Sequence, residues 1–272
     1  MPVWTTETGR LTWRRRTTRA EWARWGAWFV AVLVFAAAWR LMTQDTIWAF
    51  VWDAPTQAAD IGSRMIPPRW SYLEQLWRPL WDTLNMATLG TALAIVMATP
   101  VAFLAARNTT PSTTVVRPLA LLLIVSSRSV NAIIWALILV TLVGPGVLAG
   151  LLAIAFRSIG FIGKLIYEAI EEISTEPVEA IRATGASRLQ VLTWAVWPQI
   201  TPAFAGISVF RWDINIREAT VLGLVGAGGI GMNLESSMST LAWPQVTLIL
   251  LVILGTVVVS EYVSARVRKA VS

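Results

Sequence analysis

Four ionisable side chains crowd into one apolar stretch of the chain, FRWDINIREATVLGLV. Asp213 and Arg217 stand four positions apart with the acid first, the favourable order for an ion pair on a helix. Arg211, Asn215 and Glu218 fall on a neighbouring face of that helix. A charged side chain at the centre of a membrane helix costs roughly 2.5–3.5 kcal/mol on insertion scales, so such residues normally face a bundle interior or a water-filled path.

Two further arginines lie deep in other apolar stretches. Arg128, within VSSRSVN, and Arg157 have no acid within helical reach in their own stretches. Arginines therefore outnumber acids in these stretches, which favours anions, because guanidinium groups match phosphate or phosphonate oxygens. The predicted pathway residues are Ser127, Arg128, Asn131, Arg157, Arg211, Asp213, Asn215, Arg217 and Glu218. Two structural alternatives stay open: Asp213 and Arg217 only neutralise each other, or Arg128 forms an interhelical bond or reaches toward a membrane surface.

A glycine cluster follows the charged stretch. Gly226, Gly228 and Gly231 have the G-x-G-x-x-G spacing of a dinucleotide-binding turn, which requires a βαβ unit and an acid about twenty residues further on. After Glu235 the next acid is Glu261, in or beside the last apolar stretch, so no nicotinamide or flavin site is predicted. The glycines instead predict sharp backbone turns or close helix packing beside a membrane cavity. The set is Gly223, Gly226, Gly228, Gly229 and Gly231.

The composition indicates an all-α polytopic membrane protein. The 272 residues are 56% hydrophobic and only 14% charged, against about a quarter charged in soluble domains. The chain has no cysteine and no histidine, so we predict no catalytic residue, no metal site and no bound cofactor. The net charge of +6 is assigned to cytoplasmic loops and not to nucleic-acid binding.

Long apolar runs predict six transmembrane helices. The predicted spans are 25–42, about 83–106, 118–143, 147–169, 200–223 and 246–263. Trp39 and Arg40 stand where a signal peptide needs small residues, so the first span is expected to be uncleaved. The positive-inside rule places the basic segment 1–24 and both termini in the cytoplasm. Residues 43–82, rich in tryptophan and proline, are predicted as an extracytoplasmic loop lying partly at the interface, before a core at 83–268.

The polar loop at about 171–199, between the fourth and fifth spans, contains a predicted short helix. Thr175 is expected as its N-cap, Pro177 suits its first turn, and Gly185 is placed to end it. Val178 and Ile181 fall on one side, as in an amphipathic surface helix that simply joins two spans.

The spacing within this loop resembles the signature loop of ABC-importer permeases, E-A-A-x-x-x-G followed by nine residues and I-x-L-P. Glutamate, alanine, glycine and proline hold register here, whereas Ile181, Ala195 and Trp197 depart from the pattern. The resemblance implies a coupling helix that docks on a separate ATPase subunit, which uses ATP and Mg²⁺, since this chain has no Walker motif. The residues assigned to coupling are Glu179, Ala180, Ala183, Gly185 and Pro198.

Residues from about 80 to 268 resemble the permeases of bacterial phosphonate importers, the PhnE type. The resemblance is carried by two stretches, RWDINIREATVLGLVGAGGIG and IGFIGKLIYEAIEEI. This resemblance implies the type I ABC-importer permease fold in the bacterial inner membrane. It also implies a homodimer, two ATPase subunits and an extracytoplasmic phosphonate- or phosphate-binding protein, with the glycine cluster near the outer gate.

Asn131 stands where that family has proline, and Arg157 stands where relatives often have histidine. These departures leave phosphate, phosphite and alkylphosphonates open as the preferred anion. An importer of methionine or another small solute, a passive anion channel and a membrane enzyme are the alternatives, in that order.

Overall fold

The computed structural model describes residues 3–5, 9, 11–13 and 18–271. The chain divides into two compact units, Met1–Asp60 and Ile61–Ser272, which are described separately.

The first unit contains a small hairpin and a long apolar helix. Strand β1 (Val3–Thr5) pairs antiparallel with β2 (Leu11–Trp13), which the all-α prediction missed. Both strands consist largely of the β-branched and aromatic residues that favour extended backbone. Helix α1 (Thr18–Thr43) covers the predicted first span, and its described side chains are almost all exposed.

Residues 43–82, predicted as an extracytoplasmic loop, are largely helical in the structure. This segment contains helix α2 (Trp48–Met65), the 3₁₀ turn η1 (Trp70–Tyr72) and the first ten residues of α3 (Leu73–Ala105). The prolines and charges that suggested a loop are accommodated within helices, since Pro55 lies inside α2 and Pro79 lies inside α3.

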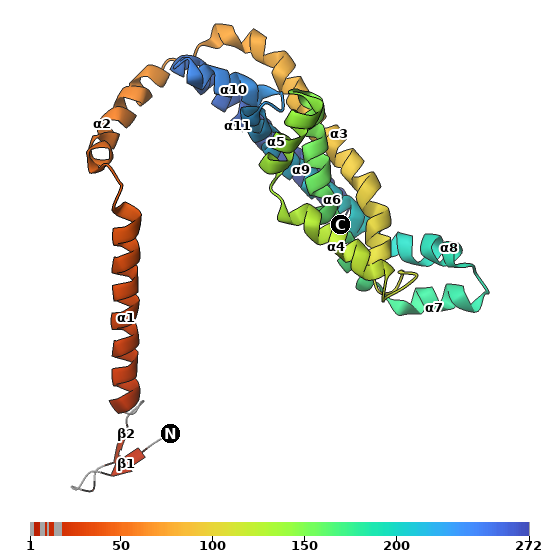
Figure 1. Cartoon of the computed structure of the whole chain (residues 1–272). Coiled ribbons are helices and arrows are strands. Elements are labelled where there is room, and N and C mark those ends of the chain that lie inside the picture. Colours follow the sequence, from red (N-terminus) through yellow and green to blue (C-terminus); the bar gives the residue numbers. More distant parts are fainter. Residues whose placement is uncertain (1–2, 6–8, 10, 14–17, 272) are drawn as a thin grey trace. The chain divides into compact units, whose positions relative to one another are not determined.

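The second unit is a helical bundle. Its long helices are α3, α6 (Val147–Glu171), α9 (Trp197–Leu222) and α11 (Trp243–Val271). They lie alongside one another, with α9 in contact with the other three (Figure 1). Close packing of α3 on α6 depends on small residues, as is usual between membrane helices. A Cβ atom on Gly90 of α3 would lie 2.9 Å from the carbonyl oxygen of Leu151 on α6.

The predicted third span is not one straight helix. Helices α4 (Val116–Ser129) and α5 (Ala132–Val143) meet at a bend of 90°. Val130 is extended, and Asn131 caps α5 because its Oδ1 accepts the N–H of Ile133 at 3.1 Å. A uniformly apolar window does not reveal such a bend, but the polar group SRSVN at its centre was a usable signal.

Four helices in the described part of the chain are long and apolar enough to cross a membrane, and the bent pair α4–α5 would make a fifth. Helix α9 is 26 residues long but carries four charged side chains within eight positions. Short helices complete the unit: α7 (Thr175–Ala183), α8 (Arg188–Val191), the π turn η2 (Leu192–Val196), the 3₁₀ turn η3 (Gly223–Val225) and α10 (Ile230–Ser239). In Figure 1, α7 and α8 project from one end of the bundle.

Candidate functional site

A buried polar network joins α9 to α3 and α6. Asn215, which is fully buried, donates from Nδ2 to Thr91 Oγ1 at 2.7 Å and to Ser158 Oγ at 3.1 Å. Arg211, only 2% exposed, donates from Nε to the same Ser158 hydroxyl at 2.9 Å. Polar bonds of this kind hold helices together in a medium without water. Two of the predicted pathway residues thus lie between helices in the bundle interior.

Glu218 is shared by two arginines. Its Oε2 accepts from Arg211 Nη2 at 3.1 Å, and its Oε1 accepts from Arg157 Nε on α6 at 3.2 Å. The Arg211 side chain is 3% exposed, whereas those of Arg157 and Glu218 are 29% and 21% exposed. Two guanidinium groups therefore face one carboxylate, which leaves a local excess of positive charge. Arg157 has no acid within helical reach on α6, and its carboxylate partner comes from α9.

The bend between α4 and α5 is held from α6. Arg157 Nη1 donates to the carbonyl oxygen of Val130, a backbone acceptor that the bend leaves without a helical partner, at 3.2 Å. Ser127 Oγ donates to the Phe156 carbonyl and accepts from the N–H of Gly160. Arg157 therefore has a structural task at the bend in addition to its bond with Glu218.

An open pocket of about 310 Å³ lies beside this bend. It is lined by Asn131, Ala132, Ile133, Arg157, Arg217, Glu218, Val221 and Leu222. Four of the nine predicted pathway residues thus come together: one amide, two guanidinium groups and one carboxylate. A small anion would find more donors than acceptors here. We take this pocket, named the bend pocket below, as the candidate site.

The predicted ion pair between Asp213 and Arg217 is confirmed. Asp213 Oδ1 also accepts the hydroxyl proton of Ser260 on α11 at 2.8 Å. The Asp213 side chain is 5% exposed, whereas that of Arg217 is 46% exposed. Asp213 therefore anchors α9 to α11, and Arg217 extends from this anchor to the bend pocket.

Ser127 and Arg128 do not line the bend pocket. Arg128 is exposed at the end of α4 and forms no ion pair with any described residue. Its aliphatic stem packs on α6, where a Cβ atom on Gly160 would lie 2.7 Å from Arg128 Cγ. The part of Arg128 in a pathway stays a prediction.

The glycine cluster forms a tight turn, as the sequence predicts. Gly226, Gly228 and Gly229 have φ angles of 84°, 85° and 72°, in the region that favours glycine. Gly223 and Gly231 permit close packing, since a Cβ atom on Gly223 would lie 2.5 Å from Gly231 Cα. The residues before the turn are helical, so the turn does not follow a β-strand as it does in a dinucleotide-binding βαβ unit.

This turn is fixed to neighbouring helices by backbone bonds. The N–H of Ile230 donates to Thr83 Oγ1 on α3 at 2.8 Å, and the N–H of Gly146, just before α6, donates to the Gly226 carbonyl at 3.0 Å. Its position relative to any gate stays a prediction.

The predicted helix in the polar loop is confirmed as α7. Its N-cap position is Ser174 and not Thr175, a shift of one residue, and Gly185 ends the turn after it with a φ of 78°. Glu179, Ala180 and Ala183 are exposed on α7. They are therefore available to a partner.

Several features of this loop were missed from the sequence. Ser187 and Gln190 form a capping box at α8, a pattern (S-x-x-Q) that could have been found. Leu189 and Trp194 are 76% and 70% exposed, which leaves large apolar side chains beside α7 and α8. Pro198, a predicted coupling residue, is the second residue of α9, which follows the π turn η2 without a break.

Side-chain bonds tie the loop to the bundle. Gln199 Oε1 accepts the N–H of Ser174 at 3.0 Å, and its Nε2 donates to the Ser174 carbonyl at 3.4 Å and to the Ala195 carbonyl at 2.8 Å. Arg188 Nη2 donates to the carbonyls of Thr109 and Thr110, beyond the end of α3, at 3.0 and 2.7 Å. These bonds hold the start of α7 to α9 and the start of α8 to the segment after α3.

Comparison with known proteins agrees with these features. Residues 98–269 match the family described as "Binding-protein-dependent transport system inner membrane component". The chain is 45% identical over 211 residues to the phosphite transport system permease protein PtxC of Stutzerimonas stutzeri, covering 78% of this chain and 76% of that protein. It is 38% identical over 233 residues to the phosphate-import permease protein PhnE of Mycolicibacterium smegmatis, covering 86% of this chain and 43% of that protein.

The fold has a solved counterpart in an inward-facing structure of the MetNI methionine ABC transporter. The TM-score is 0.66 at 20% identity, over 75% of this chain and 99% of that chain. The family match covers more than half of the chain and includes the bend pocket and the loop of α7 and α8. The chain therefore belongs to the family of inner membrane components of binding-protein-dependent transport systems.

Proposed function

We propose that this chain is the transmembrane permease subunit of an ATP-driven importer of phosphorus oxyanions, namely phosphite, phosphate or phosphonates. The observation that carries the proposal is the bend pocket, where Arg157 and Arg217 face one carboxylate. The names of the similar phosphite and phosphate permeases support the same class of anion.

The bend pocket has free donors for such an anion. A guanidinium group has five N–H donors, and the bonds of Arg157 to Glu218 and Val130 use two of them. Arg217 bonds to Asp213 and is half-exposed. Glu218 keeps the pocket from holding an anion too firmly, because its charge opposes the anion's charge. Transport requires binding that is weak enough for release.

In this proposal the chain has six spans, with α4–α5 and α9 counted as two of them. Both termini and the loop of α7 and α8 lie in the cytoplasm, and residues 43–82 lie outside the bacterial inner membrane, partly at its interface. Two copies of the chain form the pathway between them, which opens alternately to each side, with the glycine cluster at the outer gate. Two ATPase subunits that use ATP and Mg²⁺ dock on α7, and an extracytoplasmic protein delivers the anion.

The experiment is ATP hydrolysis and uptake in proteoliposomes that contain this chain, its ATPase and its binding protein. Phosphite, phosphate, methylphosphonate and methionine are compared. Stimulation of both activities by a phosphorus oxyanion supports the proposal. Stimulation by methionine alone keeps the importer but refutes the assignment of the arginines. Uptake without ATP would instead identify a passive channel, which does not need the loop of α7 and α8.

A further inference from the structure

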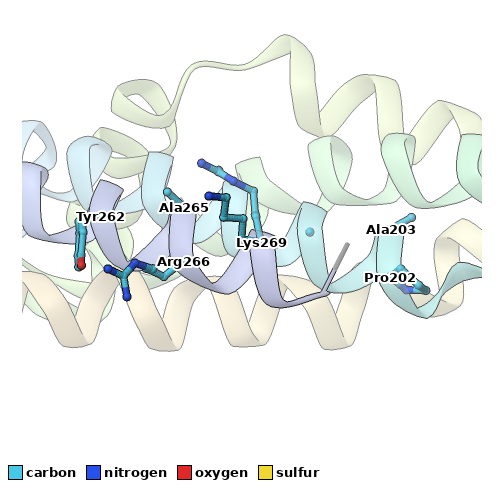
Figure 2. Close-up of a pocket in the computed structure, with 8 residues that line it drawn as sticks. Pro202, Ala203, Tyr262, Ala265, Arg266 and Lys269 are labelled. Atoms are coloured by element: carbon cyan, nitrogen blue, oxygen red, sulfur yellow. The ribbon is translucent and has the colours of Figure 1, made fainter.

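A second basic groove lies between α9 and the end of α11. It has a volume of about 680 Å³ and is lined by Pro202, Ala203, Gly206, Tyr262, Ala265, Arg266, Arg268 and Lys269. Figure 2 shows Tyr262, Ala265, Arg266 and Lys269 along one helix, with Pro202 and Ala203 on its neighbour. No residue of the bend pocket lines this groove, so the proposed transport pathway does not use it.

Three cations line the groove, namely Arg266, Arg268 and Lys269. No carboxylate lines the groove, and none of the described acids lies within ion-pair distance of Arg266, Arg268 or Lys269. Aromatic rings hold two of these side chains instead. Arg266 lies over the Tyr262 ring, 4.7 Å from its centroid, and Arg268 lies over the Phe210 ring at 6.0 Å. The cations are therefore positioned without being neutralised, as a site for an anion requires.

The floor of the groove is small and apolar. Gly206 leaves open space on α9, because a Cβ atom there would meet nothing within 4 Å. On α11 an exposed apolar stripe runs from the groove toward the middle of the helix at helical spacing, through Val258, Gly255 and Leu251. Gly255 also has no atom within 4 Å of a Cβ position. A ligand that combines an anionic head with apolar chains fits this shape, whereas a free inorganic anion would leave the stripe uncovered.

We propose that this groove binds the headgroup of an anionic phospholipid, with its acyl chains along the Val258–Leu251 stripe. The inference rests on the proposed crossing of the membrane by α11, whose basic end then lies at the cytoplasmic surface, where anionic lipids are concentrated. Tyr262 lies at the level where aromatic rings settle in membrane interfaces. A second copy of this chain is a poor occupant of the groove, since a two-fold contact would bring the same three cations together.

The test uses the full chain in phosphatidylcholine vesicles that contain a minority of phosphatidylglycerol. After extraction, native mass spectrometry counts the phosphatidylglycerol molecules retained by each chain. The variant R266Q/R268Q/K269Q is compared with R40Q/R69Q/R78Q, which loses the same charge from three exposed arginines elsewhere. Because each cation near an anionic surface contributes roughly fivefold in affinity, we expect retention to fall at least about tenfold in the first variant only.

A second pair of variants tests the groove without changing charge. Gly206→Leu fills the open space and should lower retention, whereas Gly62→Leu, at a glycine of α2 with equally open surroundings, should not. If the triple variant fails to fold, lipid retention by Gly206→Leu still tests the proposed site.

Three results would overturn the proposal. Equal loss in both charge variants would mean diffuse attraction to the membrane. Displacement of the lipid by inorganic phosphate would identify a free-anion site. A changed dimer fraction with unchanged lipid retention would assign the groove to a subunit contact. The assay contains no ATPase and measures lipid retention, not transport, so its failure is distinguishable from failure of the proposed importer.

Discussion

Neutralising Glu218 should destabilise the bundle strongly, because this carboxylate pairs with two arginines. The pair with Arg211 is the buried one, with side-chain exposures of 3% and 21% and a distance of 3.1 Å. At an effective dielectric constant near 20 the attraction alone is roughly 5 kcal/mol. Removing one partner of a buried pair costs about 3–5 kcal/mol, since a buried charge is left unpaired. The more exposed pair with Arg157 adds up to about 1 kcal/mol.

We therefore expect Glu218→Gln to lower the free energy of unfolding by about 3 kcal/mol. This is the low end of the range for a broken buried pair, because the glutamine side chain still accepts a hydrogen bond. A chain of this size should then lose roughly 6–12 °C in Tm, measured in detergent by scanning fluorimetry. Glu235→Gln is the control, since Glu235 is exposed on α10, where its side chain accepts from the Ser239 hydroxyl. It should leave Tm nearly unchanged.

The double variant Glu218→Gln/Arg211→Met decides whether the reasoning is right. If an unpaired buried guanidinium causes the loss, replacing it with an apolar side chain should restore much of the Tm. An additive, larger loss in the double variant would refute this account, and so would a wild-type Tm in Glu218→Gln.

Three further predictions concern the bend pocket and the loop of α7 and α8. Arg217→Lys should lower anion uptake while Tm changes little, because a positive charge stays beside the buried Asp213 carboxylate but the bidentate guanidinium group is lost; a large Tm loss with normal uptake would contradict this. Gln199→Leu removes the bonds to Ser174 and should lower the ratio of anion imported to ATP hydrolysed in proteoliposomes, and an unchanged ratio would mean that these bonds are not needed for coupling. Asn131→Ala removes the cap of α5 and should cost about 1 kcal/mol, or roughly 2–4 °C in Tm, whereas Asn131→Asp should retain most of the stability.

Features that depend on a few neighbouring residues could be predicted from the sequence. The pair of Asp213 and Arg217 follows from a spacing of four on one helix. Helix α7 and the turn at Gly226 follow from local stop and turn signals. The family was recognisable for the same reason, because its signature lies within one loop.

Features that depend on contacts between distant segments could not be predicted. Glu218 meets Arg157 from a position 61 residues away, and no spacing rule indicates that meeting. The 90° bend at Val130 is stabilised by a side chain of α6, so hydropathy alone gave one continuous span. The nine pathway candidates accordingly separated, with four in the bend pocket and Arg211, Asp213 and Asn215 buried between helices.

The polar face of α9 also has a consequence for biogenesis. Four charged residues within eight positions make this helix a poor candidate for release into lipid by itself, at roughly 2.5–3.5 kcal/mol for each charge at a helix centre. Its partners are the hydroxyls of Thr91 and Ser158 and the guanidinium of Arg157, which all precede it in the chain and are synthesised first. With α9 counted as a membrane span, as proposed above, its charged residues find partners on helices that are made earlier, so the order of the helices along the chain favours its assembly. Ser260, the partner of Asp213 on α11, is synthesised afterwards, when the last helix joins the bundle.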